Sequence, residues 1–120
     1  LVVEDNAVNL MVAVGILESL GWSVETAGDG LEALAAHERV PFDVIFMDCQ
    51  MPKMDGFTAT TEIRKRDSAN GIRTPIVALT ASAEGSFRER CLDAGMDDYV
   101  TKPFSRLQIA TALARLSKEP

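Results

Sequence analysis

Chemically reactive side chains stand directly after four short apolar runs of this sequence. They are Glu4 and Asp5 after residues 1–3, Asp48 after residues 44–47, Thr80 after residues 75–79, and Lys102 after residues 99–101. Three carboxylates in one site repel one another unless a cation neutralises them. Oxygen ligands without histidine or thiolate favour Mg²⁺ or Mn²⁺, and an aspartate beside such an ion is able to attack a phosphoryl group.

The other two side chains complete this chemistry. Lys102 supplies a positive charge, and the Thr80 hydroxyl is a donor for an oxyanion. A lone aspartate more often caps a loop or a helix, and Asp48 taken alone would be assigned that role. Four of five apolar runs ending in a reactive side chain favour a functional site over simple capping.

Strand and helix patterns alternate along the whole chain and must position these residues. Short apolar runs predict strands at residues 1–3, 44–47, 75–79 and 99–101, and alternating side chains predict one more at residues 22–27. Helical spacing predicts helices at residues 7–20, 31–39, 57–66, 82–94 and 106–116, with a polar loop at residues 67–74. Such alternation is typical of an α/β fold with a parallel sheet between helices, whose site lies at the carboxyl ends of the strands.

Composition limits the class of protein. A length of 120 residues with 47% hydrophobic content predicts one folded domain, and a net charge of −6 argues against direct nucleic-acid binding. No membrane-spanning run or signal peptide is present, so no membrane contact by this domain is expected. The apolar start predicts a first strand whose beginning is missing, in a domain cut from a longer chain.

The cysteines and the single histidine carry no predicted chemistry. Cys49 and Cys91 lack CxxC or histidine pairing, which predicts reduced thiols and a cytoplasmic location. His37 has no cysteine or acidic partner at metal-ligand spacing, so it is predicted to be a surface or edge histidine.

Four motifs in order carry a resemblance to one family. They are residues 2–6, residues 47–56, residues 79–81 and residues 102–104. Together they make the chain resemble, over essentially residues 1–120, the receiver domain of response regulators. The resemblance implies a flavodoxin-like (βα)5 three-layer sandwich with a five-stranded parallel sheet in the order 2-1-3-4-5.

The resemblance also implies a role for each strand-end residue. Asp48 would accept a phosphoryl group from phosphohistidine, with Thr80 and Lys102 contacting that group. Mg²⁺, or Mn²⁺ in its place, would be bound by Asp5, Asp48 and the main-chain carbonyl of Gln50, with Glu4 acting through water. Tyr99 would change rotamer together with Thr80 as a conformational switch, and the Lys102–Pro103 peptide would be cis.

The amino-acid sequence of residues 48–52 resembles that of the receivers of hybrid histidine kinases and phosphorelays. Expected partners are therefore a histidine kinase or a histidine phosphotransfer protein, in a parent chain that could itself be membrane-anchored. A phosphorylation-dependent dimer is among the assemblies that the resemblance allows. In the first helix, the predicted core stripe is Val12, Ala13, Ile16, Leu17 and Leu20. The apolar side chains left over, predicted to dock the partner, are Leu10, Met11 and Val14.

Three other functions remain open at this point. A phosphatase with an aspartyl nucleophile would want a second acid where Gln50 stands. A flavin- or nucleotide-binding module would want a phosphate loop after the first strand, where Glu4 and Asp5 repel phosphate. A scaffold that docks without phosphorylation would have no need of the reactive side chains. The resemblance implies that the domain catalyses its own phosphorylation and dephosphorylation, although it is not a conventional enzyme.

Overall fold

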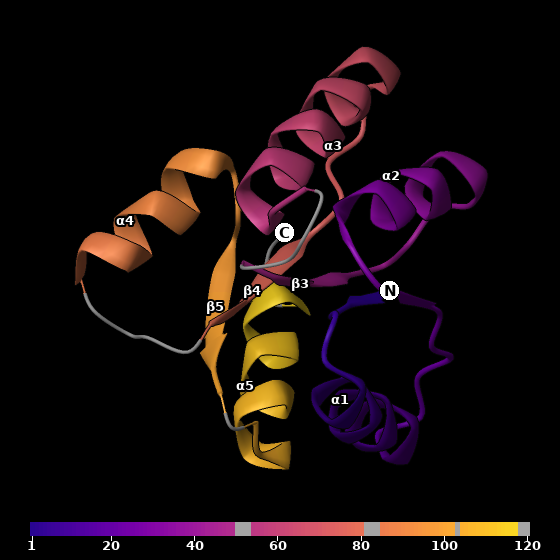
Figure 1. Ribbon diagram of the computed structural model, residues 1–120, viewed down its shortest axis with the longest axis vertical. Coiled ribbons are helices and arrows are strands. Elements are labelled where there is room, and N and C mark those ends of the chain that lie inside the picture. The colour runs from indigo at the N-terminus through magenta and orange to yellow at the C-terminus, as the bar shows by residue number, and fades with distance from the viewer. Residues whose placement is uncertain (50–53, 81–84, 103, 118–120) are drawn as a thin grey trace.

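The computed structural model describes residues 1–49, 54–80, 85–102 and 104–117. Five strands alternate with five helices in this part of the chain (Figure 1). The strands are β1 (Val2–Val3), β2 (Thr26–Ala27), β3 (Ile45–Asp48), β4 (Ile76–Thr80) and β5 (Asp98–Thr101). The helices are α1 (Ala7–Ser19), α2 (Gly30–Arg39), α3 (Gly56–Asn70), α4 (Gly85–Ala94) and α5 (Arg106–Ser117).

The strands form one parallel sheet in the order β2-β1-β3-β4-β5, so the predicted fold and strand order are confirmed. The register pairs Val3 with Met47, Asp48 with Leu79, and Thr80 with Thr101. The carboxyl ends of the four strands β1, β3, β4 and β5 therefore lie within two residues of one another in the register. This alignment brings the residues that follow these strands to one edge of the sheet.

Each face of the sheet is covered by helices over its own core. Alternate strand residues face opposite sides, so Ile45 and Met47 join one core while Phe46 joins the other. The first core packs against α2, α3 and α4, and the second packs against α1 and α5 (Figure 1). Burial on both faces explains why the strand sequences are continuous apolar runs. None of the helices in the described residues has both the length and the apolar character that a membrane crossing requires.

Helix α3 is longer than predicted, which corrects the loop expected at residues 67–74. The helix runs to Asn70 and ends at Gly71, whose φ of 72° is the left-handed conformation that favours glycine. Asp67 lies inside the helix with its side chain buried, and its carboxylate accepts a hydrogen bond of 2.7 Å from the Thr74 N–H. A polar residue that the pattern assigned to a loop therefore anchors the chain between α3 and β4.

The second strand is shorter than predicted. Only Thr26 and Ala27 pair with β1, because β1 itself has only two residues and offers no longer ladder. Trp22 and Val24 belong to the predicted strand but pack against the second core from an irregular segment. Their alternation reflects burial of one side of this segment and not a strand ladder.

The buried face of α1 differs from the predicted stripe at two residues, Leu10 and Val12. Val12 is 42% exposed, whereas Leu10 packs against the second core. Leu10 lies three residues before the buried Ala13, which is followed four residues later by the buried Leu17. Spacings of three and four residues keep side chains on one face of a helix. Leu10 therefore takes the core position that was predicted for Val12.

Candidate active site

The reactive side chains meet at the carboxyl edge of the sheet, as the strand ends predict. Asp48 and Thr80 are the last residues of β3 and β4, and both are buried. Glu4 directly follows β1, and its N–H donates to the Ala27 carbonyl at 3.0 Å. Lys102 directly follows β5, and its N–H donates to the Thr80 carbonyl at 2.7 Å. The sheet's own hydrogen bonds therefore set the backbone positions of the site.

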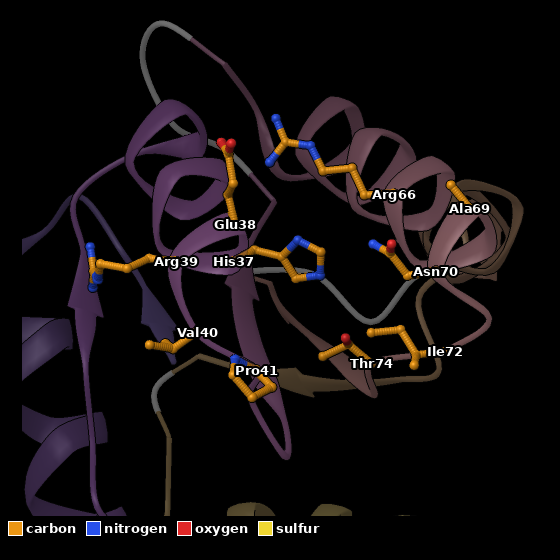
Figure 2. Close-up of a pocket in the computed structure, with 10 residues that line it drawn as sticks. All are labelled: His37, Glu38, Arg39, Val40, Pro41, Arg66, Ala69, Asn70, Ile72 and Thr74. Carbon is orange, nitrogen blue, oxygen red and sulfur yellow. The ribbon is translucent and has the colours of Figure 1, made fainter.

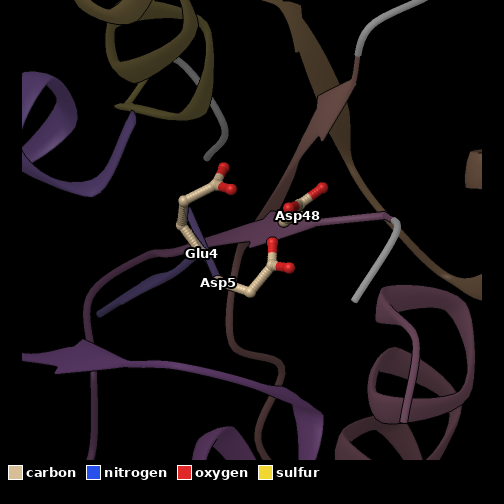
Figure 3. A group of neighbouring side chains, drawn as sticks. All are labelled: Glu4, Asp5 and Asp48. Carbon is tan, nitrogen blue, oxygen red and sulfur yellow. The ribbon is translucent and has the colours of Figure 1, made fainter. Parts of the chain in front are cut away.

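Three carboxylates converge at this edge (Figure 3). One ligand oxygen from each of Glu4, Asp5 and Asp48 lies within 4.8 Å of the other two. Glu4 and Asp48 are buried, while Asp5 is exposed and leaves the group open to solvent. Hard oxygen donors in a partly open group fit Mg²⁺, which keeps several of its waters when it binds a protein.

Among the described residues, Lys102 supplies positive charge to this group of carboxylates. Its Nζ is 2.9 Å from Glu4 Oε2 and 3.2 Å from Asp48 Oδ2. Burial acts to lower the pKa of Lys102, but its contacts with Glu4 and Asp48 outweigh burial and raise that pKa above its ordinary value. Lys102 is therefore an ammonium at neutral pH, and it holds a positive charge against the carboxylate of Asp48.

Two expected features lie outside the described residues. Gln50, expected to offer its main-chain carbonyl to a cation, is one of them, and Pro103 of the expected cis peptide is the other. Tyr99, the expected switch residue, is described: it lies in β5 beside Ala78 of β4 and packs, half-buried, against the first core.

A model of the family described as "Response regulator receiver domain" matches residues 1–114 of this chain. The chain belongs to the response regulator receiver domain family. Membership of this family decides against the flavin- or nucleotide-binding module that the sequence alone left open.

Histidine kinases are among the proteins similar to this chain. "Probable histidine kinase 2" from Oryza sativa is 44% identical over 132 residues, which cover 98% of this chain but only 13% of that protein. The chain thus spans about an eighth of the length of this relative. The receiver domain of sensor histidine kinase PA1611 from Pseudomonas aeruginosa is 46% identical with a TM-score of 0.86, covering 96% of this chain and 93% of that one. Its structure is described as having a magnesium ion coordinated in the active site cleft.

A second solved structure shows a receiver domain with a partner. It is a co-crystal of the Saccharomyces cerevisiae histidine phosphotransfer protein Ypd1 with the receiver domain of its downstream response regulator Ssk1. The Ssk1 receiver is 30% identical to this chain with a TM-score of 0.91, covering 96% of this chain and 85% of that one.

The predicted docking residues have different environments in this receiver domain. Met11 is 74% exposed, Val14 is half-buried, and Leu10 packs against the core. Two apolar side chains that the prediction did not include, Val8 at 69% and Val12 at 42%, are also exposed on α1. The apolar surface of α1 is therefore made of Val8, Met11 and Val12, because the helix is rotated relative to the predicted stripe.

His37 was predicted to be a surface or edge histidine, and the structure corrects this. Its side chain is only 7% exposed, and its Nε2 lies 2.8 Å from Oδ1 of Asp67. The prediction was wrong because it placed Asp67 in a loop, whereas the longer α3 presents that carboxylate to α2. An acidic residue at helical spacing from Ile63 on a buried face was the available signal.

His37 also lines a cavity of about 460 Å³ between α2 and α3 (Figure 2). The lining includes Val40 and Pro41, which precede β3, and Ile72 and Thr74, which precede β4. The cavity is therefore at the amino edge of the sheet, opposite the acid cluster. The His37–Asp67 pair joins two helices there and takes no part in the chemistry at Asp48.

Replacing Asp67 with asparagine is expected to lower the free energy of unfolding at pH 7 by about 1–3 kcal/mol, because buried donors lose a charged acceptor. Burial acts to raise the pKa of Asp67, but hydrogen bonds from Thr74 and His37 hold it below 3.8. The unfolded chain then binds more protons near pH 4, so this stabilisation is complete above that pH and is lost as pH falls through the folded pKa.

Chemical denaturation between pH 3 and pH 7 would measure this difference. The gap between the original chain and Asp67→Asn should shrink as the pH falls. Asp93→Asn, which changes an exposed carboxylate of α4, is the control and should leave stability nearly unchanged. A gap that stays constant across this pH range would contradict the assignment.

Proposed function

We propose that this receiver domain accepts a phosphoryl group from phosphohistidine onto Asp48 and serves in a phosphorelay. The observation that carries the proposal is the placement of Asp48 Oδ2 3.2 Å from the Lys102 ammonium, inside a group of three carboxylates. Burying carboxylates together is unfavourable unless positive charge neutralises them. A site that binds a cation, and through the cation a phosphoryl group, meets this condition. A site with only a structural role would not require this arrangement.

In the proposed reaction, a carboxylate oxygen of Asp48 attacks phosphorus on the phosphohistidine. A P–O bond forms as the P–N bond breaks, and the electron pair of that bond stays on the imidazole nitrogen. Lys102 then offers its ammonium to the transferred oxygens, and the Thr80 hydroxyl donates a hydrogen bond to one of them. Both groups are carried by strand ends, so they are held in place before the reaction begins.

Mg²⁺ is the proposed cofactor, and Mn²⁺ suits the same oxygen ligands. Asp5, Asp48 and the main-chain carbonyl of Gln50 would hold the ion, with Glu4 acting through water while it also contacts Lys102. When bound, the ion supplies positive charge that stabilises the oxygens of the transferred group. Support comes from the three-carboxylate donor set and from the magnesium ion in the PA1611 receiver.

The first test is the intact mass of the protein after incubation with acetyl phosphate. We expect a gain of one phosphoryl group with Mg²⁺ and none when a chelator removes the metal. A gain that is independent of metal would contradict the cation role. No gain from either acetyl phosphate or a phosphohistidine protein would favour the scaffold that docks without phosphorylation.

Phosphorylation is proposed to shift the domain between two conformations through Thr80 and Tyr99. The two residues lie on neighbouring strands, since β4 pairs with β5, and Tyr99 packs, half-buried, against the first core. A ligand that binds one conformation better shifts the population toward it, and the phosphoryl group would act in this way.

The proposed partner is a histidine phosphotransfer protein or the phosphohistidine domain of a kinase, docked on the apolar surface of α1. Val8, Met11 and Val12 offer exposed apolar side chains beside the acid cluster, since α1 begins two residues after Asp5. The complex of the Ssk1 receiver with Ypd1 supports a partner of this class. Because the similar kinases are much longer, we propose that the domain works within a hybrid histidine kinase in the cytoplasm.

Met11→Glu is expected to slow phosphoryl transfer from a phosphohistidine protein by about 10- to 100-fold, because a desolvated charge at an apolar interface costs on the order of 1–3 kcal/mol. Transfer from acetyl phosphate should be unchanged, since this small donor reaches Asp48 without docking on α1. The measurement is the rate of each transfer by mass spectrometry. Equal slowing with both donors would contradict docking on α1, and Leu107→Glu, at an exposed position of α5, is a matched control.

A further inference from the structure

Two buried thiols lie beside the acid cluster and have no part in the proposed reaction. Cys49 Sγ and Cys91 Sγ are 3.9 Å apart, although the residues are 42 positions apart in sequence. Their exposed fractions are 1% and 2%. Cys49 directly follows the proposed phosphoacceptor at the end of β3, and Cys91 lies in α4. The pair therefore links the site to one helix of the outer layer.

We propose that a peroxide oxidises Cys49 and Cys91 to an intramolecular disulfide, and that this bond slows phosphoryl transfer to Asp48. The second half of this inference rests on the proposed function. The first half concerns only the two sulfurs and stands independently of it. The modification would make the receiver domain responsive to oxidants as well as to its phosphoryl donor.

The chemistry balances with hydrogen peroxide as the oxidant. The sulfur of Cys91 attacks one peroxide oxygen, the O–O bond breaks, and one water leaves, which gives a sulfenic acid. The sulfur of Cys49 then attacks the sulfenic sulfur, the S–O bond breaks, and a second water leaves with the remaining thiol proton. Two sulfurs lose one electron each, and the peroxide takes up both electrons in becoming water.

The two sulfurs must come closer together before the disulfide bond is able to form. A disulfide is about 2.05 Å long, so the two sulfurs must approach by roughly 1.9 Å. Cys49 is held on both sides: its N–H donates to Leu79 O at 3.1 Å, and its carbonyl accepts from Gly56 N at 3.2 Å. A Cβ built on Gly56 would lie 3.0 Å from Cys49 Cα, so this backbone is closely packed. The backbone of Cys49 is therefore restrained, and we expect the approach to come from rotation of the two side chains and from movement of α4.

Movement of α4 reaches the site through the sheet, because α4 contacts β5, whose Thr101 pairs with Thr80 at the end of β4. The cross-link would thus act on Asp48 through its neighbour Cys49 and on Thr80 through α4. Misplacement of reacting groups by about 1 Å costs on the order of 100-fold in rate. We expect the disulfide to slow phosphorylation by about 10- to 100-fold.

The experiment treats the reduced protein with hydrogen peroxide, removes the peroxide with catalase, and alkylates free thiols under denaturing conditions. The expected product has lost two hydrogen atoms, takes up no alkylating reagent, and yields one peptide pair that joins Cys49 to Cys91. Its Mg²⁺-dependent phosphorylation by acetyl phosphate should be slower, and dithiothreitol should restore the rate. A product oxidised only to sulfinic acid, or joined only between molecules, would overturn the inference.

Two variants serve as controls, Cys91→Ala and Cys91→Ser, so that poor folding of one does not prevent the comparison. When reduced, both should accept the phosphoryl group at the original rate, and peroxide should leave that rate unchanged. Equal slowing of the variants by peroxide would overturn the role of the disulfide. Absence of phosphorylation in the reduced original protein would instead count against the proposed function, while the mass change still tests the bond.

Discussion

Asp48→Asn is expected to abolish phosphorylation by acetyl phosphate and by phosphohistidine proteins alike. An amide oxygen is a much weaker nucleophile than a carboxylate, and asparagine also replaces a negatively charged oxygen expected to hold Mg²⁺ by a neutral one. The change preserves the size of the side chain and removes a negative charge from a group that also contains Glu4 and Asp5. We therefore expect a folded protein whose intact mass does not change with either donor.

The matched control for this variant is Asp43→Asn. Asp43 is an exposed aspartate before β3, and its replacement should leave both the mass gain and its Mg²⁺ dependence intact. Thermal unfolding of both variants would show that the loss of phosphorylation does not come from misfolding. A phosphoryl group still present on Asp48→Asn would place the acceptor at another residue, and peptide mapping would then identify it.

Lys102→Met is expected to slow phosphorylation by acetyl phosphate by about 10²- to 10³-fold. The ammonium 3.2 Å from Asp48 Oδ2 is a preorganised positive charge, and removal of one such group from a reacting site has effects of this size. Methionine keeps a similar length and packing volume but carries no charge. The measurement is the initial rate of mass gain at saturating Mg²⁺.

The same variant should also change stability. Glu4 and Asp48 would lose the cation at 2.9 and 3.2 Å, which we expect to lower the free energy of unfolding by about 1–3 kcal/mol, less than for a fully buried pair because Lys102 is partly exposed. The pKa of Lys102 is raised by folding, so its contribution is complete below pH 10.5 and is lost as pH rises through the folded pKa.

Mg²⁺ provides a second readout for this variant. An ion that binds the folded protein stabilises it by mass action, and it should stabilise Lys102→Met more than the original chain because it replaces the missing charge. Lys65→Met removes an exposed lysine of α3 and is the control for both readouts. A phosphorylation rate equal to that of the original chain would remove Lys102 from the proposed reaction.

The sequence was sufficient to predict the sheet and the residues at its edge. Parallel strands buried on both faces are short apolar runs, and each run ends where the chain leaves the core. A reactive side chain at that point, such as Asp48 or Lys102, therefore marks both the end of a strand and the place of a site. The order of strands, by contrast, came from the resemblance of four motifs to the family.

Predictions failed where a local pattern had two structural explanations. The polar residues of the predicted loop at 67–74 are compatible with the end of a helix, and burial of Asp67 beside His37 decided for the helix. The alternating residues at 22–27 pack on a core, but β1 is too short to pair with them all. In α1, Leu10 and Val12 are equally apolar, and contact with the second core selected Leu10.

The sequence by itself determined the elements, their order along the chain and the side chains at the strand ends, because these depend on periodicity and on neighbouring residues. Only the tertiary structure decided which distant side chains meet away from the strand ends. It placed His37 against Asp67 and Cys49 against Cys91. These pairs depend on strand register and on the rotation of packed helices, and both are set by filling a core that distant parts of the chain share.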